Sequence, residues 1–187
     1  AVDLWDFYGT RVGQVARRMI RRRIRELWPN TKGETVLGLG YATPFLRPFR
    51  DEAERVIAVM PSQQGVLHWP REGKGLVCLS DEAELPLQDV SVDRVLLVHA
   101  LECTEQLRPM LQEIWRVLAG NGKLLVVVPN RRGIWALPYY RIRNPAETWD
   151  DINSFQLVEG RVVDAARVRN VVYLNFGPDW RTDFTFR

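Results

Sequence analysis

Hydrophobic residues are arranged in two patterns along the chain. Helical spacing predicts helices, and short continuous runs predict strands. Apolar residues recur at helical spacing in residues 11–28, with most arginines on the opposite face, which predicts an amphipathic helix that ends before Pro29. A second helical pattern covers residues 105–118 and ends at AGNG (119–122), which predicts a turn. Short, nearly continuous apolar runs predict five buried strands, at residues 34–40, 55–61, 76–80, 92–100 and 123–130.

Apolar strands that alternate with helices or loops indicate an α/β protein with a doubly wound, mostly parallel sheet. Right-handed crossovers put helices on both faces of such a sheet, and its ligands bind at the carboxyl ends of the strands. We therefore expect a cofactor site at that edge. The strand ends that meet there are Gly38-Leu39-Gly40-Tyr41, Met60-Pro61, Asp81-Glu82 and His99-Ala100-Leu101.

The pattern changes near residue 137, where a segment with two prolines and no helical period begins. We interpret residues 1–136 as the α/β domain and residues 137–153 as a linker. Dense Val, Tyr and Phe in residues 154–187 predict three short strands of a small antiparallel β segment. Two interpretations of that segment are open: an appended β module of oligonucleotide-binding type, or strands that complete the first sheet.

Composition narrows the class of protein. With 46% hydrophobic residues among 187, the chain is long enough for one domain, or for one domain with an appendage, and is not a disordered chain. No run approaches the roughly 18 apolar residues of a membrane helix, and residues 1–14 show no signal peptide, so we expect a cytoplasmic protein. Cys78 and Cys103 have neither metal-ligand spacing nor a disulfide framework, so no metal centre is expected.

The net charge of +3 hides an uneven distribution. Residues 1–50 carry ten basic residues against four acidic ones, residues 51–113 five against twelve, and residues 114–187 eleven against seven. Two interpretations of the arginine face at residues 11–28 are open. It is either the solvated side of a helix docked on the core, or a surface that binds nucleic acid or lipid headgroups.

Several segments between residues 36 and 130 occur in the order and spacing of a known family. Residues 36–40 (VLGLG) form a strand with a glycine loop, and residues 55–62 form a second strand. The acidic run at 81–87 precedes SVDRV (91–95), and WRVLAGNGKL (115–124) leads into the fifth strand. In these motifs the chain resembles the class I S-adenosylmethionine-dependent methyltransferases, of the small-molecule-type subgroup. Phe7-Tyr8 with Val12-Gly13 is also similar to the lead-in helix of some members.

The resemblance implies S-adenosylmethionine as cofactor and transfer of its methyl group to a small-molecule acceptor. A glycine-rich loop lets the backbone approach the cofactor, and carboxylates at the next strand ends accept hydrogen bonds from ribose and adenine. Methyl transfer is an in-line displacement on a sulfonium, so the protein mainly positions the reactants, and no catalytic residue is assigned. The residues expected to bind the cofactor are Tyr8, Gly38, Gly40, Tyr41, Met60, Pro61, Asp81, Glu82 and His99.

The chain departs from the family's pattern at two acidic positions. Gly38 stands where the first motif usually has an acid, and Met60 stands where an acid usually ends the second strand. Ala42 and Pro44 replace two loop glycines, whereas Asp81 is retained. Each missing charge-assisted hydrogen bond weakens cofactor binding by roughly 1.5–3 kcal/mol. A second hypothesis follows: a catalytically inactive methyltransferase-like scaffold that binds a protein or nucleic acid through basic surfaces.

The last third of the chain does not continue this resemblance. Family members next add a helix, a sixth strand and an antiparallel seventh strand, but no clear helix follows Trp135. Residues 159–163, 172–177 and 179–185 are weakly similar to a β module found beside thermonuclease-type domains, without the nuclease's catalytic residues. Arginine and aromatic side chains there would suit a stacking surface for nucleic acid. They are Arg161, Arg167, Arg169, Tyr173, Trp180 and Arg181.

Overall fold

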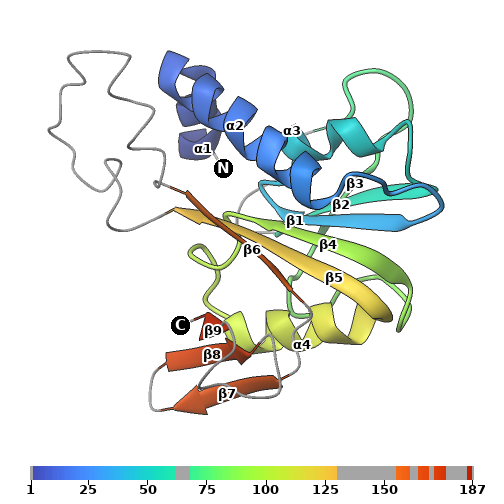
Figure 1. Cartoon of the computed structure of the whole chain (residues 1–187), viewed down its shortest axis with the longest axis vertical. Coiled ribbons are helices and arrows are strands. Elements are labelled where there is room, and N and C mark those ends of the chain that lie inside the picture. The colour runs from blue at the N-terminus through green and yellow to red at the C-terminus, as the bar shows by residue number, and fades with distance from the viewer. Residues whose placement is uncertain are drawn as a thin grey trace, which may run out of the picture.

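Two helices lead into a six-stranded sheet, and a three-stranded sheet follows it (Figure 1). This computed structural model describes residues 2–61, 68–129, 155–160, 164–168, 171–175 and 185–186. The helices are α1 (Val2–Gly9), α2 (Arg11–Leu27), α3 (Thr43–Leu46) and α4 (Leu107–Val117), with a 3-10 turn η1 (Arg47–Phe49). The strands are β1 (Thr35–Gly40), β2 (Arg55–Pro61), β3 (Val77–Ser80), β4 (Val92–Val98), β5 (Leu118–Pro129), β6 (Phe155–Gly160), β7 (Asp164–Val168), β8 (Val171–Asn175) and β9 (Thr185–Phe186).

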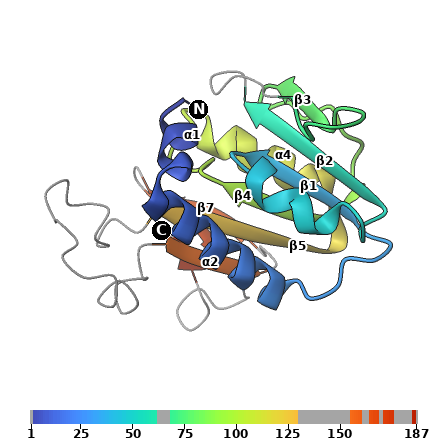
Figure 2. The same ribbon diagram turned by 90° about the horizontal axis from the view of Figure 1, so that it is seen from above.

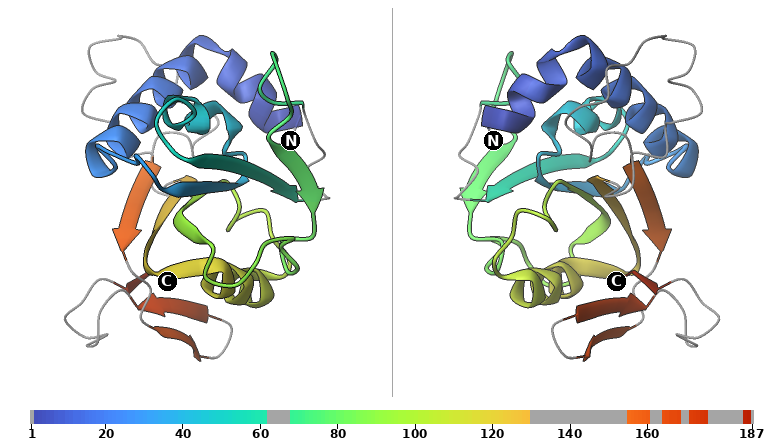
Figure 3. Two further views of the ribbon diagram at one scale, coloured as in Figure 1. Left: turned by 90° about the vertical axis from the view of Figure 1, so that its right-hand side faces the viewer. Right: turned by 90° about the vertical axis from the view of Figure 1, so that its left-hand side faces the viewer.

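The first sheet has the order β3-β2-β1-β4-β5-β6, and β1 to β5 are parallel neighbours. The chain builds outward from β1 to β3 and then returns to place β4 and β5 on the other side of β1. The order therefore reverses between β1 and β4, which is where doubly wound sheets bind ligands. Helices α1 to α3 cover one face and α4 covers the other (Figure 3). The predicted doubly wound, mostly parallel α/β fold is confirmed.

Strand residues alternate between two hydrophobic clusters, one on each face of the sheet. Leu37 and Leu39 of β1 pack in the cluster that includes α4 residues such as Ile114. Val36 packs in the opposite cluster, with α2 residues such as Ile24. Both faces of each central strand are therefore buried, which is why these strands are nearly continuous apolar runs in the sequence.

The predicted amphipathic helix is α2, which lies on the face seen in Figure 2. Thr10 separates α1 from α2, because its Oγ1 accepts a hydrogen bond from the Gly13 amide at 3.0 Å and caps the new helix. Ala16, Ile20 and Ile24 face the core. This arrangement supports the docked-helix interpretation of residues 11–28, with α1 as an additional helix before it.

One prediction at the end of α4 is wrong. Residues 119–122 belong to β5, which starts at Leu118, where a turn was expected. The register shifts there, since Val92 pairs with Leu118 while Arg94 pairs with Lys123. Gly120 and Asn121 are residue types that favour turns. Here they lie at an irregularity within β5, and β5 pairs with β4 both before and after it.

The C-terminal strands combine features of both interpretations of residues 154–187. β6 pairs antiparallel with β5 at the edge of the first sheet, and β7, β8 and β9 form a separate antiparallel sheet. The linker predicted at 137–153 lies outside the described residues, as do the side chains of the nucleic-acid surface predicted on the C-terminal strands. The domain boundaries at 136 and 154 stay a prediction.

Two features of the connections matter for the site. Helix α3 has four residues, and the described part of the β2–β3 connection, residues 68–76, contains no helix. In residues 68–76 a loop therefore lies beside β2, in a connection where a doubly wound fold usually places a helix. Among the described helices, none is long and apolar enough to cross a membrane.

The loop after β3 is fastened to α4 through Glu113 and Arg116. Glu113 accepts hydrogen bonds from Arg116 Nη2 at 2.7 Å and from the Leu85 amide at 2.8 Å. Arg116 also donates to the carbonyl oxygens of Leu85 and Leu87. These bonds hold the pKa of Glu113 below its ordinary value, the Arg116 bond most strongly. They also fix the loop that carries Asp81 and Glu82.

We expect Glu113→Gln to lower the melting temperature by a few degrees at pH 7. A lowered folded-state pKa contributes stability that is present above the unfolded value near 4.5 and is lost as the pH falls through the folded value. The difference between wild type and variant should therefore shrink below about pH 4.5. Thermal unfolding at pH 7 and at decreasing acid pH measures this. A difference independent of pH would contradict the ionised contact.

Candidate functional site

The predicted site residues lie at the carboxyl ends of β1 to β4, but the structure brings only some of them together. Tyr8 reaches this edge from α1 and contacts both Tyr41, after β1, and His99, after β4. Met60 and Pro61 end β2 and are buried. Asp81 and Glu82 follow β3 and contact other partners.

Gly40 makes the turn that carries the chain away from β1. Its φ is +81°, and a Cβ on this residue would lie 2.5 Å from the carbonyl oxygen of Val98. The next amide, that of Tyr41, donates a hydrogen bond to the same oxygen at 2.8 Å. The loop after β1 therefore stays attached to the end of β4, at the point where the strand order reverses. Only glycine fits this backbone without strain.

The two positions that lack the family's acids are closed by packing. A Cβ on Gly38 would lie 2.6 Å from Leu46 Cδ1 and 2.7 Å from the Ala42 Cβ, so α3 occupies the space of any side chain there. Met60 is 1% exposed and is among the large, fully buried side chains. Neither position can therefore carry a carboxylate without repacking. Whether Gly38 and Met60 contact a cofactor stays a prediction.

A buried hydrogen-bonded series joins Tyr8, His99 and Glu102. The Tyr8 hydroxyl lies 2.8 Å from His99 Nε2, and His99 Nδ1 lies 2.6 Å from Glu102 Oε1. An ionised Glu102 can only accept, so Nδ1 carries the proton, and Nε2 of the neutral imidazole accepts from Tyr8. His99 also has a left-handed backbone, with φ +52°. A non-glycine residue in this conformation is held by its surroundings, and such residues cluster at functional sites.

Tyr8 is held in its neutral form. Burial raises the pKa of its phenol, and the neighbouring Tyr41 and Glu102 raise it further. Its ring is stacked on Tyr41, with centroids 5.4 Å apart and planes 9° apart. Phe45 packs edge-on against the same ring. Tyr8 can therefore act as a hydrogen-bond donor to the neutral imidazole of His99.

We expect Tyr8→Phe to lower the free energy of unfolding by about 1–3 kcal/mol, because His99 Nε2 loses this buried donor. The matched variant is Tyr41→Phe, whose hydroxyl has no hydrogen bond among the described residues and whose ring keeps its stacking. Urea unfolding of both variants measures the difference. Equal losses would show that the Tyr8–His99 hydrogen bond does not stabilise the protein.

The two acids after β3 have different surroundings. Asp81 is exposed, and its carboxylate accepts a hydrogen bond from the Ala83 amide at 2.9 Å. Glu82 is 6% exposed and accepts from the Thr104 hydroxyl. Asp81 is thus available to a ligand, whereas Glu82 ties the β3 loop to the segment after β4. Glu102 and Thr104 were not among the site residues predicted from the sequence. Their contacts join segments that follow different strands, and the local sequence pattern does not indicate such contacts.

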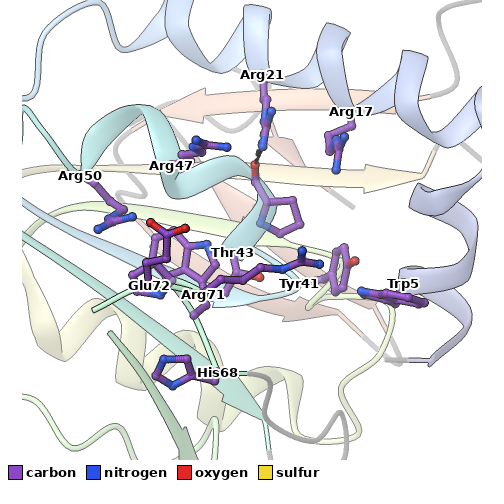
Figure 4. A pocket seen from close by; sticks show the side chains of 13 residues that line it. Trp5, Arg17, Arg21, Tyr41, Thr43, Arg47, Arg50, His68, Arg71 and Glu72 are labelled. Carbon is purple, nitrogen blue, oxygen red and sulfur yellow. Dashed lines mark hydrogen bonds between the residues drawn. The ribbon is translucent and has the colours of Figure 1, made fainter. Parts of the chain in front are cut away.

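A cavity of about 640 Å³ adjoins the loop after β1, on the face that carries α2. Tyr41 is the only residue that it shares with the set predicted to bind the cofactor. Its lining instead comes from α1, α2, the α3–η1 segment and the loop before β3 (Figure 4). Of the described part of the chain, five arginines line it, which are Arg17, Arg21, Arg47, Arg50 and Arg71.

Comparison with known proteins shows what the segment that contains these strands is similar to. Residues 36–126 match the family model described as a methyltransferase domain. No curated protein matches the sequence of the chain.

Three solved structures share the fold. A candidate methyltransferase from Bacillus halodurans is 19% identical, with 59% of this chain and 51% of that chain covered and a TM-score of 0.50. A candidate S-adenosyl-L-methionine-dependent methyltransferase from Methanococcus maripaludis is 14% identical, with 65% and 58% covered and a TM-score of 0.51. A SAM-dependent methyltransferase from Archaeoglobus fulgidus is 22% identical, with 73% and 66% covered and a TM-score of 0.50. The chain spans only about half of the first of these proteins.

Proposed function

We propose that the chain is, through residues 36–126, a class I S-adenosylmethionine-dependent methyltransferase that binds this cofactor and transfers its methyl group to a small-molecule acceptor. The observation that carries the proposal is the backbone turn at Gly40. It lies where the strand order reverses, and its left-handed backbone holds the loop after β1 against the end of β4, at the edge where doubly wound sheets bind ligands. Asp81, exposed at the end of β3, supplies a carboxylate on the same edge of the sheet.

The residues present fit the cofactor in part. The Gly40 turn holds the loop after β1 at the edge of the sheet where the cofactor would lie, and the exposed Asp81 offers an acceptor for the adenine amino group. The bound cofactor would supply a methyl group on a positively charged sulfur, which is the reactive centre. The ribose would lack its usual carboxylate, since Met60 ends β2 and is buried. We therefore expect binding that is weaker than in family members with both acids.

The roles of the chain's own residues follow from this arrangement. Gly40 and Tyr41 shape the loop, and Asp81 accepts a hydrogen bond. Tyr8 and His99 fix the carboxyl end of β4 against α1, so they position the edge of the site. His99 is 4% exposed and both of its ring nitrogens have partners within the protein, so we assign it no proton transfer.

We expect Asp81→Asn to weaken binding of S-adenosylhomocysteine roughly tenfold, because a hydrogen bond to a charged acceptor becomes a neutral one. Glu84→Gln is the matched control, since Glu84 is an exposed acid in the same turn with no side-chain partner among the described residues. Equilibrium dialysis with labelled ligand measures both. Equal losses in the two variants would show that net charge, and not the position of Asp81, affects binding.

The small-molecule acceptor is supported by the resemblance of residues 36–130 to the small-molecule-type subgroup. A cofactor with a labelled methyl group, incubated with the protein and a cell extract, tests this. We expect the label in the low-mass fraction. Label found only in proteins or nucleic acids would contradict the proposed acceptor class while leaving methyl transfer intact.

A further inference from the structure

The cavity beside the loop after β1 gathers positive charge from three separate parts of the chain. Arg17 and Arg21 come from α2, Arg47 and Arg50 come from η1 and the residue after it, and Arg71 comes from the loop before β3. Figure 4 shows these side chains around one hollow. Among the residues that the structure describes, Glu72 is the single acid that lines it.

Arg17 and Arg21 are half-buried and the other three are exposed, and all five differ from the half-buried arginines elsewhere among the described residues. Arg25, Arg94 and Arg116 each form an ion pair, with Glu52, Glu34 and Glu113 respectively. Among the described residues, none of the five cavity arginines has an ion-pair partner. Their charges are thus left uncompensated where several guanidinium groups share one space, an arrangement that attracts anions.

Two of the five show the effect of this crowding. Burial lowers the pKa of Arg21, and the nearby positive charges of Arg17 and Arg47 lower it further. Arg21 donates to the carbonyl oxygen of Pro44, so it is anchored at the wall. Arg17 Nε is buried and has no hydrogen-bond partner among the described residues. An anion in the cavity would relieve the repulsion and supply this partner.

We propose that this cavity binds a ligand that carries two or more linked phosphate groups. Guanidinium groups offer planar pairs of N–H donors that match phosphate oxygens, and several of them are needed to balance more than one negative charge. The volume of about 640 Å³ is within the range of small-molecule sites and exceeds the need of a single small ion. The proposal does not rest on methyl transfer, because the arginines lie outside the set that would bind S-adenosylmethionine.

Aromatic side chains also line this cavity. Trp69 lies under the Arg50 guanidinium, whose Cζ is 5.8 Å from the ring centroid. Trp5 is 56% exposed and lines the end near Tyr41 (Figure 4). An exposed indole beside a cationic hollow suits the ring of a nucleoside diphosphate. Inorganic pyrophosphate carries the same linked phosphates without a nucleoside. Comparing it with ADP, a nucleoside diphosphate, therefore shows whether the nucleoside contributes to binding.

The test is a titration of the whole chain with pyrophosphate and with ADP, without cofactor and at low salt, followed by tryptophan fluorescence. The variant is Arg47→Gln with Arg71→Gln, since both side chains are exposed and neither has a hydrogen bond among the described residues. We expect binding that weakens about a hundredfold in this variant and that decreases with salt. The matched control is Arg18→Gln with Arg22→Gln, which removes the same charge from the exposed side of α2.

Each outcome decides the proposal. Binding of pyrophosphate that the cavity variant loses and the control keeps supports it, and tighter binding of ADP indicates that the nucleoside ring also contacts the cavity. Absence of binding for both probes at millimolar concentration would overturn it. Equal losses in variant and control would also overturn it, because they indicate attraction by overall charge. Circular dichroism of the variants checks that each is folded, and S-adenosylhomocysteine binding by the cavity variant tests the methyltransferase proposal separately.

Discussion

Gly40→Ala is expected to lower the free energy of unfolding by about 2–5 kcal/mol and to remove cofactor binding. A left-handed backbone costs a non-glycine residue roughly 1–2 kcal/mol, and forcing a methyl group into filled space adds about 1–3 kcal/mol. Both apply here, because φ is +81° and the added Cβ would lie 2.5 Å from the Val98 carbonyl oxygen. Relief of this contact moves the loop after β1 away from β4, which is where we place the cofactor.

Two other glycines allow the backbone cost and the steric cost to be measured separately. Gly33 and Gly73 have φ of +76° and +88°, and a Cβ on either would meet nothing within 4 Å. Gly33→Ala and Gly73→Ala should therefore cost only the backbone term of about 1–2 kcal/mol. Urea unfolding of the three variants gives the comparison. If Gly40→Ala costs no more than Gly33→Ala, the loop after β1 does not pack against β4 as described.

Trp28→Ala is expected to cost about 3–5 kcal/mol, the range for removal of a fully buried large aromatic side chain. Trp28 is 0% exposed at the end of α2 and packs against Phe49, with ring centroids 5.8 Å apart. The Arg94 guanidinium lies over the same ring at 5.7 Å. Loss of the indole would therefore leave a cavity between α2 and the sheet and remove a cation–π contact.

Trp115 provides the control for this variant. It is 51% exposed on α4, so Trp115→Ala should change the free energy of unfolding by no more than about 0.5 kcal/mol. Chemical denaturation followed by circular dichroism measures both without relying on tryptophan emission. Similar small effects for the two variants would contradict the packing of α2 on the sheet.

The sheet could be predicted from the sequence because a strand that is buried on both faces is a nearly continuous apolar run. The central strands β1, β2 and β4 are nearly all apolar and mostly buried, and the helical spacing of residues 11–28 gave α2 within one residue of its observed end. Residues 119–122 were predicted wrongly because Gly and Asn favour turns locally, while pairing with β4 keeps the segment in β5. Tertiary contacts therefore override local propensity at that point.

The site was predictable only where the backbone itself sets the residue type. Gly40 was recognised because a strand-to-loop turn at this edge needs glycine. The hydrogen bond between Tyr8 and His99 joins residues 91 positions apart, so it depends on how α1 crosses the sheet edge. The arginine cavity is assembled from three distant segments, and in the sequence Arg17 and Arg21 look the same as the arginines on the exposed face of α2. Only the fold separates the two sets.

The central claim is that this chain binds S-adenosylmethionine at the carboxyl edge of its first sheet. Calorimetric titration of the wild-type chain with S-adenosylhomocysteine tests it most directly, because this product binds without turnover and needs no knowledge of the acceptor. We predict saturable heat with one ligand per chain and a rise in melting temperature. No heat and no thermal shift at millimolar ligand would contradict the claim.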